Sequence, residues 1–503
     1  MVGSVICNGK TYSHHGLVGY GLIPSDARDK FGDTLGGLGS SVVIEQPTWE
    51  RSVNGTYKGV AWCLPDRGWY VLRCSFELPL RESDRNRKGT LNFQNRVHKI
   101  GLEFTLNSGV TAGSPSQPNL KLKYLDTILF TGPDNIPTTG IDADAQGPYL
   151  SYPGFPDLPA ATFTGDGFGQ DGPIAHRIAL DCEGLVLSPD GSFWVSDEYG
   201  PYIYRFSSDG ELLQAICPPD AYIPHRNGEK SFSSASPPFY NPGAVVTPVD
   251  PESGRGNNQG FEGLTISHDQ KKLYALPQSA LNQEGGKSRK TRKNARLIEF
   301  DITQAGKAVY AHEYVVPLPT YDNGKVAGQS DIVLVTDNQF LILARDSNAG
   351  HGADKAKSLY RQVDIFDISD ATDIKSSLYD SATGAIADQN GNLAGGIVPA
   401  KYCQFLDIND NSELAKFGLH NGKPQNQGLL NEKWESISLV PVQPGDDGPQ
   451  GSGGGKEYFM LCFSDNDFVT QNGRMNFGKF QFQDESGYEL DTQVLVFHVT
   501  LPR

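Results

Sequence analysis

Short runs of apolar residues alternate with polar and turn-forming residues along most of the chain. In the clearest example, residues 181–187 begin with polar residues and continue as an apolar strand pattern. Residues 188–191 (Ser-Pro-Asp-Gly) then predict a turn, and residues 193–197 form a second apolar strand pattern. Residues 260–266 and 273–276 repeat this plan. Alternation with a period of two, interrupted by a turn, predicts an antiparallel strand pair. Each pair begins with an acidic or small residue and ends in polar residues.

The strand pair recurs along the chain, which indicates a repeat protein. Copies begin near residues 35, 181, 260, 330 and 434, and further strand pairs follow, as at residues 202–206 with 212–216. Four strands per unit, repeated around an axis, form the blades of a β-propeller. We therefore predict an all-β fold in which residues 1–503 form a single propeller domain. Strands from both ends of the chain, such as residues 493–499, are expected to close the ring.

The number of blades depends on one interval. From residue 35 to residue 181 the interval is about twice that from residue 181 to residue 260. The extra length predicts either a sixth blade within residues 91–180 or long insertions. Five or six blades are expected, with six preferred.

Three stretches interrupt the strand rhythm. Residues 131–173 and 217–259 are rich in Gly, Pro and Asp, and each precedes the first strand of a blade. They are predicted to be long loops that cap one face of the propeller, where function concentrates. Residues 444–456, in contrast, lie between a first and a second strand, so they are expected on the opposite face.

Composition limits the class of partner. The chain has 57 Gly, 32 Pro and a formal net charge of −16, and an acidic chain lacks the basic face that binding to nucleic acid or an anionic membrane requires. No stretch approaches the roughly 18 consecutive apolar residues of a membrane-spanning helix. The one basic run, residues 287–296, is expected to be a solvated loop. A small molecule is the expected partner, and nothing in the sequence indicates the oligomeric state.

Two features favour the secretory pathway, although the first residues show no signal peptide. The sequon Asn54-Gly55-Thr56 would accept a glycan, and Cys63 and Cys74 lie symmetrically about a turn on what read as paired strands. Seven cysteines leave at least one unpaired. Secretion is therefore expected, with a cytoplasmic location still open.

Polar side chains stand at both ends of the predicted strand pairs. The start of a first strand and the end of a second, antiparallel strand lie at the same edge of a blade, so a rotational repeat brings these side chains to one mouth of the central channel. The strand-start residues are Glu183, Glu262 and Glu435. The strand-end residues are Asp66, Arg67, Asp197, Glu198, Gln278, Arg345, Asp465 and Asn466. Tyr199 and Phe468 adjoin them and could wall an organic ligand.

A ring of carboxylates persists only with a cation, an arginine or a proton between its members. Glutamate, aspartate and amide oxygens suit Ca²⁺, and Glu262, Glu435 and Asn466 are the candidate ligands. Asp66, Asp197, Tyr199, Gln278, Asp465 and Phe468 are the candidate substrate-binding residues. The alternative is structural, because Asp and Glu at strand ends also cap turns.

Signals for other chemistry are missing from the sequence. It contains no nucleophile elbow, phosphate loop or dinucleotide fingerprint, so no nucleotide or redox cofactor is expected. Only His14 and His15 form a close pair of histidines, and no zinc motif occurs.

Four segments resemble the phytase-like family, also described by an esterase-like activity of phytase. They are residues 181–185 (Asp-Cys-Glu-Gly-Leu), 196–201 (Ser-Asp-Glu-Tyr-Gly-Pro), 260–264 (Gly-Phe-Glu-Gly-Leu) and 275–279 (Ala-Leu-Pro-Gln-Ser). The resemblance extends from about residue 33 to residue 499 and implies a propeller with a polar funnel. One fold supports many reactions, so it does not fix the activity.

Two classes of enzyme and one binding function remain open. The chain is similar to phytase-like proteins of fungal tropolone sesquiterpenoid biosynthesis, which implies dehydration to a reactive diene and an intermolecular hetero-Diels-Alder addition. In that class Glu183, Glu198, Arg67 and Arg345 would be the catalytic residues, polarising a carbonyl and helping water to leave. The alternative is a secreted, metal-dependent esterase or phosphatase. A third possibility is a propeller that only binds. The sequence favours the first, because it offers no hydrolytic nucleophile.

Overall fold

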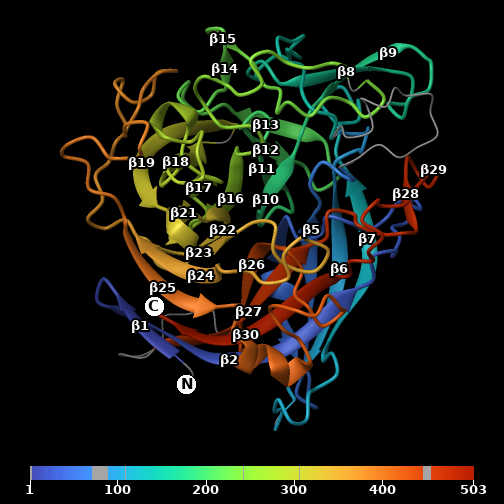
Figure 1. Cartoon of the computed structure of the whole chain (residues 1–503), viewed down its shortest axis with the longest axis vertical. Coiled ribbons are helices and arrows are strands. Elements are labelled where there is room, and N and C mark those ends of the chain that lie inside the picture. Colours follow the sequence, from blue (N-terminus) through green and yellow to red (C-terminus); the bar gives the residue numbers. More distant parts are fainter. Residues whose placement is uncertain are drawn as a thin grey trace.

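Five antiparallel sheets surround a common centre in the computed structural model (Figure 1). The structure describes residues 3–70, 89–107, 109–241, 243–304, 306–445 and 455–502. The innermost strand of each sheet contacts those of both neighbouring sheets, so the ring is closed. The fold is the predicted all-β propeller of four-stranded blades, here with five blades.

Blades I to IV each take their strands in chain order from the centre outward. Blade I contains β3 (Ser41–Ile44), β5 (Thr56–Leu64), β6 (Arg96–Thr105) and β7 (Leu120–Leu129), with β4 (Glu50–Arg51) beside β5. Blade II contains β10 (Cys182–Leu187), β11 (Phe193–Asp197), β12 (Ile203–Phe206) and β13 (Leu212–Ile216). Blade III contains β16 (Phe261–Ile266), β17 (Lys272–Pro277), β18 (Asn294–Gln304) and β19 (Lys307–Pro317). Blade IV contains β22 (Gly328–Leu334), β23 (Gln339–Arg345), β24 (Arg361–Asp367) and β25 (Lys401–Asp407).

Blade V joins the two ends of the chain. Its order from the centre is β26 (Lys433–Pro441), β27 (Lys456–Asp465), β30 (Thr492–Leu501), β2 (Lys10–Ile23) and β1 (Gly3–Cys7). The predicted strand at residues 493–499 therefore does close the ring, paired on one side with β27 and on the other with β2. A disulfide between Cys7 of β1 and Cys403 of β25 ties this blade to blade IV.

The remaining elements are short. Four two-stranded hairpins comprise β8 (Ala160–Thr164) with β9 (Ile174–Ile178), β14 (His225–Arg226) with β15 (Glu229–Lys230), β20 (Thr320–Tyr321) with β21 (Lys325–Val326), and β28 (Gly473–Met475) with β29 (Phe480–Phe482). Within the described residues the helical segments are α1 (Asn411–Leu414), η1 (Gln46–Thr48), η3 (Asn282–Glu284), η4 (Asp322–Gly324) and η5 (Ala415–Phe417). None of these helices has the length and apolar character needed to cross a membrane.

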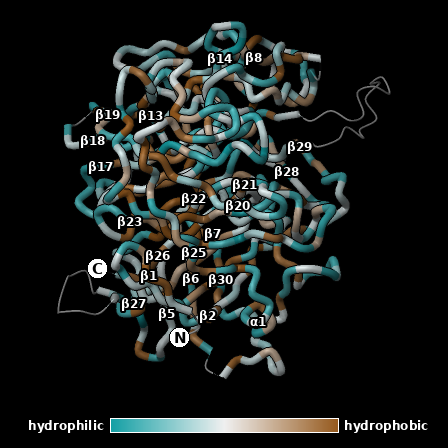
Figure 2. Tube along the Cα trace, turned by 60° about the vertical axis from the view of Figure 1, so that its left-hand side comes forward, coloured by the Kyte–Doolittle hydropathy of each residue, from teal (hydrophilic) through white to brown (hydrophobic). Residues whose placement is uncertain are grey.

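The core lies between neighbouring blades, where apolar faces of the sheets meet. Aromatic pairs mark these contacts, with ring centroids 5.1 Å apart for Trp62 and Phe193, between blades I and II, and 5.0 Å apart for Tyr57 and Phe459, between blades I and V. Figure 2 shows hydrophobic positions along inner strands such as β22 and β23 and hydrophilic positions over much of the outer chain. Each pair adds about 0.5–1.5 kcal/mol beyond the area it buries.

The structure corrects three expectations. Residues 91–180 supply the outer strands β6 and β7 of blade I and the hairpin of β8 and β9, so this interval holds insertions and no sixth blade in its described part. The basic run at residues 287–296 is no fully solvated loop, because Arg292 and Arg296 are buried and β18 begins within it. Cys63 is a free thiol on β5, which pairs with β3 and β6, while Cys74 lies outside the described residues.

The two predicted capping stretches contain short strands, β8 in the first and β14 with β15 in the second, and their capping role stays a prediction. Residues 131–173 and 217–259 meet at the edge where the first strands begin: the Asp142 carboxylate accepts hydrogen bonds from the Ser234 and Ser236 amides, at 2.8 and 2.9 Å, and the Tyr199 hydroxyl donates to the Gly140 carbonyl, at 2.9 Å. The stretch at residues 444–456 links the first two strands of blade V, and its residues 446–454 lie outside the described part.

Candidate functional site

Four of the innermost strands begin with a β-bulge. In each of them the antiparallel register shifts, so one residue near the strand start has no partner on the second strand. A bulge re-aims the side chain of the extra residue. The extra residues, in chain order, are Glu183, Glu262, Ser330 and Glu435. Three blades thus present a glutamate at one repeated position.

A second position recurs at the end of the second strand. In blade II, Gly184 is the first residue after the bulge and pairs with Ser196 on the second strand. The second position is Glu198, two residues after Ser196, and the same rule gives it in the other blades. In blade I, where β3 carries no such bulge, the pairing of Ser41 with Leu64 gives the same position. The five residues are Asp66, Glu198, Gln278, Arg345 and Asp465.

Contacts join the two sets of residues within and between blades. The Gln278 amide donates to the Glu262 carboxylate within blade III, and Arg345 of blade IV forms an ion pair with Glu435 of blade V. The hydroxyl of Ser40, just before blade I, donates to Asp465 Oδ2 of blade V, at 2.9 Å. The strand-start and strand-end residues therefore meet at one edge of the ring, which we call the mouth.

Three carboxylates of blade II form the tightest cluster at the mouth. One oxygen from each of Asp181, Glu183 and Glu198 lies within 4.8 Å of the others, and all three residues are buried. Arg67 forms an ion pair with Asp181 through its guanidinium and donates its backbone N–H to Asp181 Oδ1, at 3.1 Å. Both oxygens of Glu198 are buried without a hydrogen-bond partner. A buried, unpartnered carboxylate is costly to maintain and points to a missing proton or cation.

Burial and mutual repulsion favour the protonated forms of these groups. Burial raises the pKa of Glu198 to about 8, and the nearby charge of Asp181 adds to this. The pKa of Glu183 is raised well above its usual value by burial and then by Glu262. Asp465, on blade V, has its pKa raised to about 7 by burial and then by Glu435. These carboxyls therefore hold protons near neutral pH unless a cation replaces them.

The cations at the mouth are already committed to partners. Arg67 also donates to the Asn258 side chain, and Arg345 pairs with Glu435. Lys433 Nζ lies 2.6 Å from Asp467 Oδ1 and 3.8 Å from Glu435 Oε1. Among the described residues, the buried carboxylates of the mouth outnumber these three cations. A fourth buried cation, Arg255, acts on Glu198 from a distance while its guanidinium donates to the Tyr199 and Phe232 carbonyls.

Four of the candidate residues have contacts that organise turns. The Asp197 carboxylate accepts hydrogen bonds from the backbone amides of Asp181, Tyr199 and Gly200, at 2.8, 3.1 and 2.6 Å. Tyr199 is fully buried. Asn466 accepts from the amides of Gly37 and Phe468 and donates to the Leu490 carbonyl. Phe468 is fully buried, with its ring centroid 5.3 Å from that of Phe93. These contacts hold the loops of the mouth together, and the ligand-binding roles expected for the four residues stay predictions.

Sequence reasoning left out three residues that complete the mouth. Asp181 opens the blade II segment, and its acidic character next to Glu183 was a usable signal. Lys433 precedes the blade V bulge by two positions. Asn258 belongs to the loop before blade III and has a left-handed backbone (φ 52°); no sequence pattern connects it with Arg67.

A family model shows the family of this chain, and a curated relative covers most of its length. A model of the phytase-like family, described by an esterase-like activity of phytase, matches residues 96–447. A protein of Arthroderma benhamiae, described as an uncharacterized secreted protein, is 54% identical over 477 residues, which cover 93% of this chain and 89% of the relative.

Two solved structures are similar at low identity. An N-acetylgalactosamine deacetylase from F. plautii, solved with blood group B trisaccharide, has a TM-score of 0.34 and 9% identity, over 97% of this chain and 95% of that one. A luciferin-regenerating enzyme has a TM-score of 0.25 and 10% identity, over 81% of this chain and 89% of that one. Neither likeness is strong enough to bear on function.

Proposed function

The chain belongs to the phytase-like family, and we propose that it is a calcium-dependent hydrolase of carboxylic or phosphoric esters with its centre at the mouth of the propeller. The observation that carries the proposal is the Asp181, Glu183 and Glu198 cluster, in which both Glu198 oxygens are buried without partners. The family's description by an esterase-like activity supports the reaction class.

The donor set fits Ca²⁺. Its three members offer only carboxylate oxygens, the hard ligands that Ca²⁺ prefers, and bulges set the same kind of side chain nearby in blades III and V. This changes the expected ligands from Glu262, Glu435 and Asn466 to the blade II cluster, because Asn466 already binds three backbone groups. When bound, Ca²⁺ would polarise an ester oxygen and lower the pKa of a water molecule.

The residues around the cluster fit the remaining tasks. Arg67 lies at the cluster through its ion pair with Asp181 and can stabilise negative charge that develops on the ester. The charge of Glu262 acts on Glu183. The pKa of Glu262 is itself raised well above the usual value, first by burial and then by the charge of Glu198. A carboxyl of this kind can hold a proton at neutral pH and give it to a leaving group. Gln278 orients it through the hydrogen bond to Glu262 Oε1.

A second candidate is the dehydration and hetero-Diels-Alder reaction. It is favoured by one observation: with no cation bound, Glu198 has a pKa of about 8 and is an acid at neutral pH, able to help water leave. The reaction also needs an apolar wall to orient two neutral partners. The aromatic candidates Tyr199 and Phe468 are fully buried in packing contacts, so the described groups at the mouth favour the hydrolase.

One experiment separates these functions. Protein dialysed against calcium-free buffer is assayed for calcium by elemental analysis, and for hydrolysis of chromogenic carboxylic and phosphoric esters with and without added Ca²⁺. We expect the wild type to retain calcium and to hydrolyse at least one ester. Glu183→Gln should lose the calcium and about 10²- to 10⁴-fold in kcat. Glu103→Gln, at a side chain of β6 that is 41% exposed, is the matched control and should change neither.

Each other outcome has a meaning. A wild type without calcium and without ester turnover contradicts the hydrolase, and acid-dependent turnover of a tropolone-type substrate would then support the second candidate. A chain that binds a ligand at the mouth with no turnover would be a binding propeller.

Secretion is part of the proposal. The disulfide between Cys7 and Cys403 belongs to an oxidising compartment, and the relative at 54% identity is described as secreted. Asn54 of the sequon lies on an exposed turn before β5, where a glycan would fit. Calcium is abundant enough outside the cell to fill sites of modest affinity, about 10⁻⁴–10⁻³ M for extracellular modules.

A further inference from the structure

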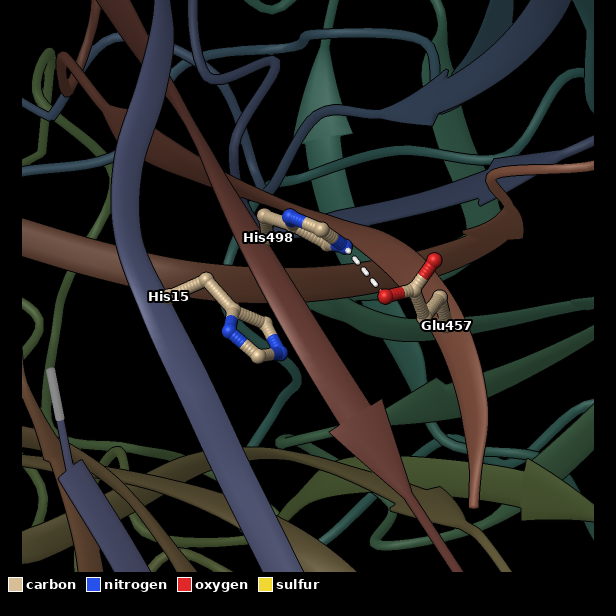
Figure 3. A group of neighbouring side chains, drawn as sticks. All are labelled: His15, Glu457 and His498. Carbon is tan, nitrogen blue, oxygen red and sulfur yellow. Dashed lines mark ion pairs between the residues drawn. The ribbon is translucent and has the colours of Figure 1, made fainter. Parts of the chain in front are cut away.

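Three neighbouring strands of blade V bring two histidines and a glutamate together far from the mouth residues in the sheet. His15 lies on β2, His498 on β30 and Glu457 on β27 (Figure 3). One ligand atom from each lies within 4.8 Å of the other two. His498 Nε2 and Glu457 Oε1 are 3.6 Å apart, and the His15 and His498 ring centroids are 4.5 Å apart.

The strand register explains why these side chains meet. His498 pairs with Phe459 on β27, so Glu457, two residues away on β27, presents its side chain on the same face. On the other side, His498 pairs with Gly16, and the register shifts between His14 and Gly16. His15 is the extra residue of that bulge, which sets its side chain beside His498.

Glycine at position 16 is required for this bulge. Its φ is +95°, and a Cβ there would meet the Glu413 carboxylate at 2.2 Å. Glu413 Oε2 in turn accepts the Leu17 amide, at 2.7 Å. The bulge that positions His15 is therefore fixed by its surroundings.

The polar atoms of the cluster are incompletely satisfied. His498 Nε2 is buried and has no hydrogen-bond partner. His15 Nε2 contacts Thr500 Oγ1 at 2.8 Å, which orients the His15 ring. The Glu457 side chain is 54% exposed and that of His498 is 25% exposed. The cluster therefore has a buried nitrogen, His498 Nε2, that makes no hydrogen bond, and it can be reached from solvent.

We propose that His15, Glu457 and His498 form a binding site for a zinc-type divalent transition-metal ion, which ties β2, near the start of the chain, to β27 and β30, near its end. Two imidazoles and one carboxylate are a common zinc donor set, with a fourth position left for water. Ligand atoms about 2.1 Å from a tetrahedral zinc ion lie about 3.4 Å apart, close to the 3.6 Å between His498 and Glu457. Thr500 Oγ1 lies 2.8 Å from His15 Nε2 and holds the ring in place while no ion is bound.

The donor chemistry separates this site from the mouth. Imidazole nitrogens suit zinc and its neighbours in the transition series, whereas carboxylates alone suit Ca²⁺. The inference therefore does not depend on the proposed function, and loss of zinc is expected to leave the calcium content unchanged.

The test uses the full chain without a histidine tag, stripped with a chelator and titrated with ZnCl₂ against a chromophoric zinc indicator. We expect one equivalent of zinc to bind, and its affinity to fall at least tenfold in His15→Ala and in His498→Ala. His14→Ala is the matched control: the neighbouring ring packs against Phe405, with centroids 5.7 Å apart, and takes no part in the cluster. Its zinc affinity should equal that of the wild type.

Two further readings complete the test. Zinc should raise the thermal unfolding midpoint of the wild type and of His14→Ala and leave that of His15→Ala unchanged. Glu457→Gln, at an exposed side chain, keeps the test decisive if a histidine variant does not fold. A wild type that binds no zinc, or equal binding by His14→Ala, His15→Ala and Glu457→Gln, would overturn the proposal.

Discussion

The mouth of the propeller and the closure of its ring in blade V both gather ionisable side chains, but they do so in different ways. The mouth repeats one position from blade to blade, so Glu183, Glu262 and Glu435 arrive as chemically identical groups. The closure brings together strands from opposite ends of the chain, so His15 and His498 meet a glutamate with no repeat relation to them. Repetition produces a surplus of like charge, whereas closure produces a mixed donor set.

The two regions also differ in burial, and this sets their energetics. Glu198 and Asp181 are fully buried, and the charge of Asp181 raises the pKa of Glu198, so charge at the mouth is strongly coupled to stability. At the closure, Glu457 is half exposed, and the disulfide and the strand ladder hold the structure. Charge substitutions should therefore matter at the mouth, and cross-link removal should matter at the closure.

The largest effect is expected when the mouth loses one cation. Arg345→Met leaves the buried Glu435 with only the more distant Lys433, 3.8 Å away. This should cost about 3 to 5 kcal/mol in the free energy of unfolding, measured by denaturant titration. The double variant Arg345→Met with Glu435→Gln should recover most of this loss. Lys121→Met, which breaks an exposed pair with Glu103, should cost less than about 1 kcal/mol. Equal costs for Arg345→Met and Lys121→Met would remove the contrast between buried and exposed charge.

A smaller effect is expected at the closure. Cys403→Ser opens the cross-link between β1 and β25, whose cysteines are 396 residues apart. A disulfide typically contributes about 2 to 4 kcal/mol, less than chain entropy alone would give for so long a loop, and we expect a loss in that range. Cys217→Ser, at an exposed free thiol, is the control and should be nearly neutral. An unfolding midpoint unchanged in Cys403→Ser would show that the strand ladder alone closes the ring.

The smallest expected effect is a pH dependence at the mouth. In calcium-free protein the pKa of Glu198 is raised from an ordinary 4.5 to about 8, so the folded chain holds a proton that the unfolded chain has released. Its stabilising contribution is complete below about pH 4.5 and is lost as the pH rises through about 8. As the pH is raised from about 5 to about 9, the free energy of unfolding should fall in both proteins, and it should fall by about 1 to 3 kcal/mol less in Glu198→Gln than in the wild type. Identical pH profiles would mean that Glu198 is already ionised and matched by a cation.

Much of the mouth could be predicted from repeated positions. Glu183, Glu262, Gln278, Arg345, Glu435 and Asp465 occupy the edge that alternating strands and turns assign to them. Their contacts could not be predicted, because hydrogen bonds such as that from Ser40 to Asp465 join residues 425 positions apart. Asp197 and Asn466 look like ligands in the sequence, yet their oxygens accept backbone amides, a local competition that residue type does not reveal.

The sequence by itself determined the class of this protein: short alternating strands, turn residues and a recurring four-strand unit have one compact solution, a ring of blades with polar strand ends at a shared edge. The tertiary structure decided the rest. It set five blades, because residues 96–129 complete blade I, and it placed His15 beside His498, because β2 pairs with β30. The alternation that predicts a strand depends on neighbouring residues in the sequence. The closure of the ring depends on pairing between strands from opposite ends of the chain, such as β2 and β30, which only the folded structure shows.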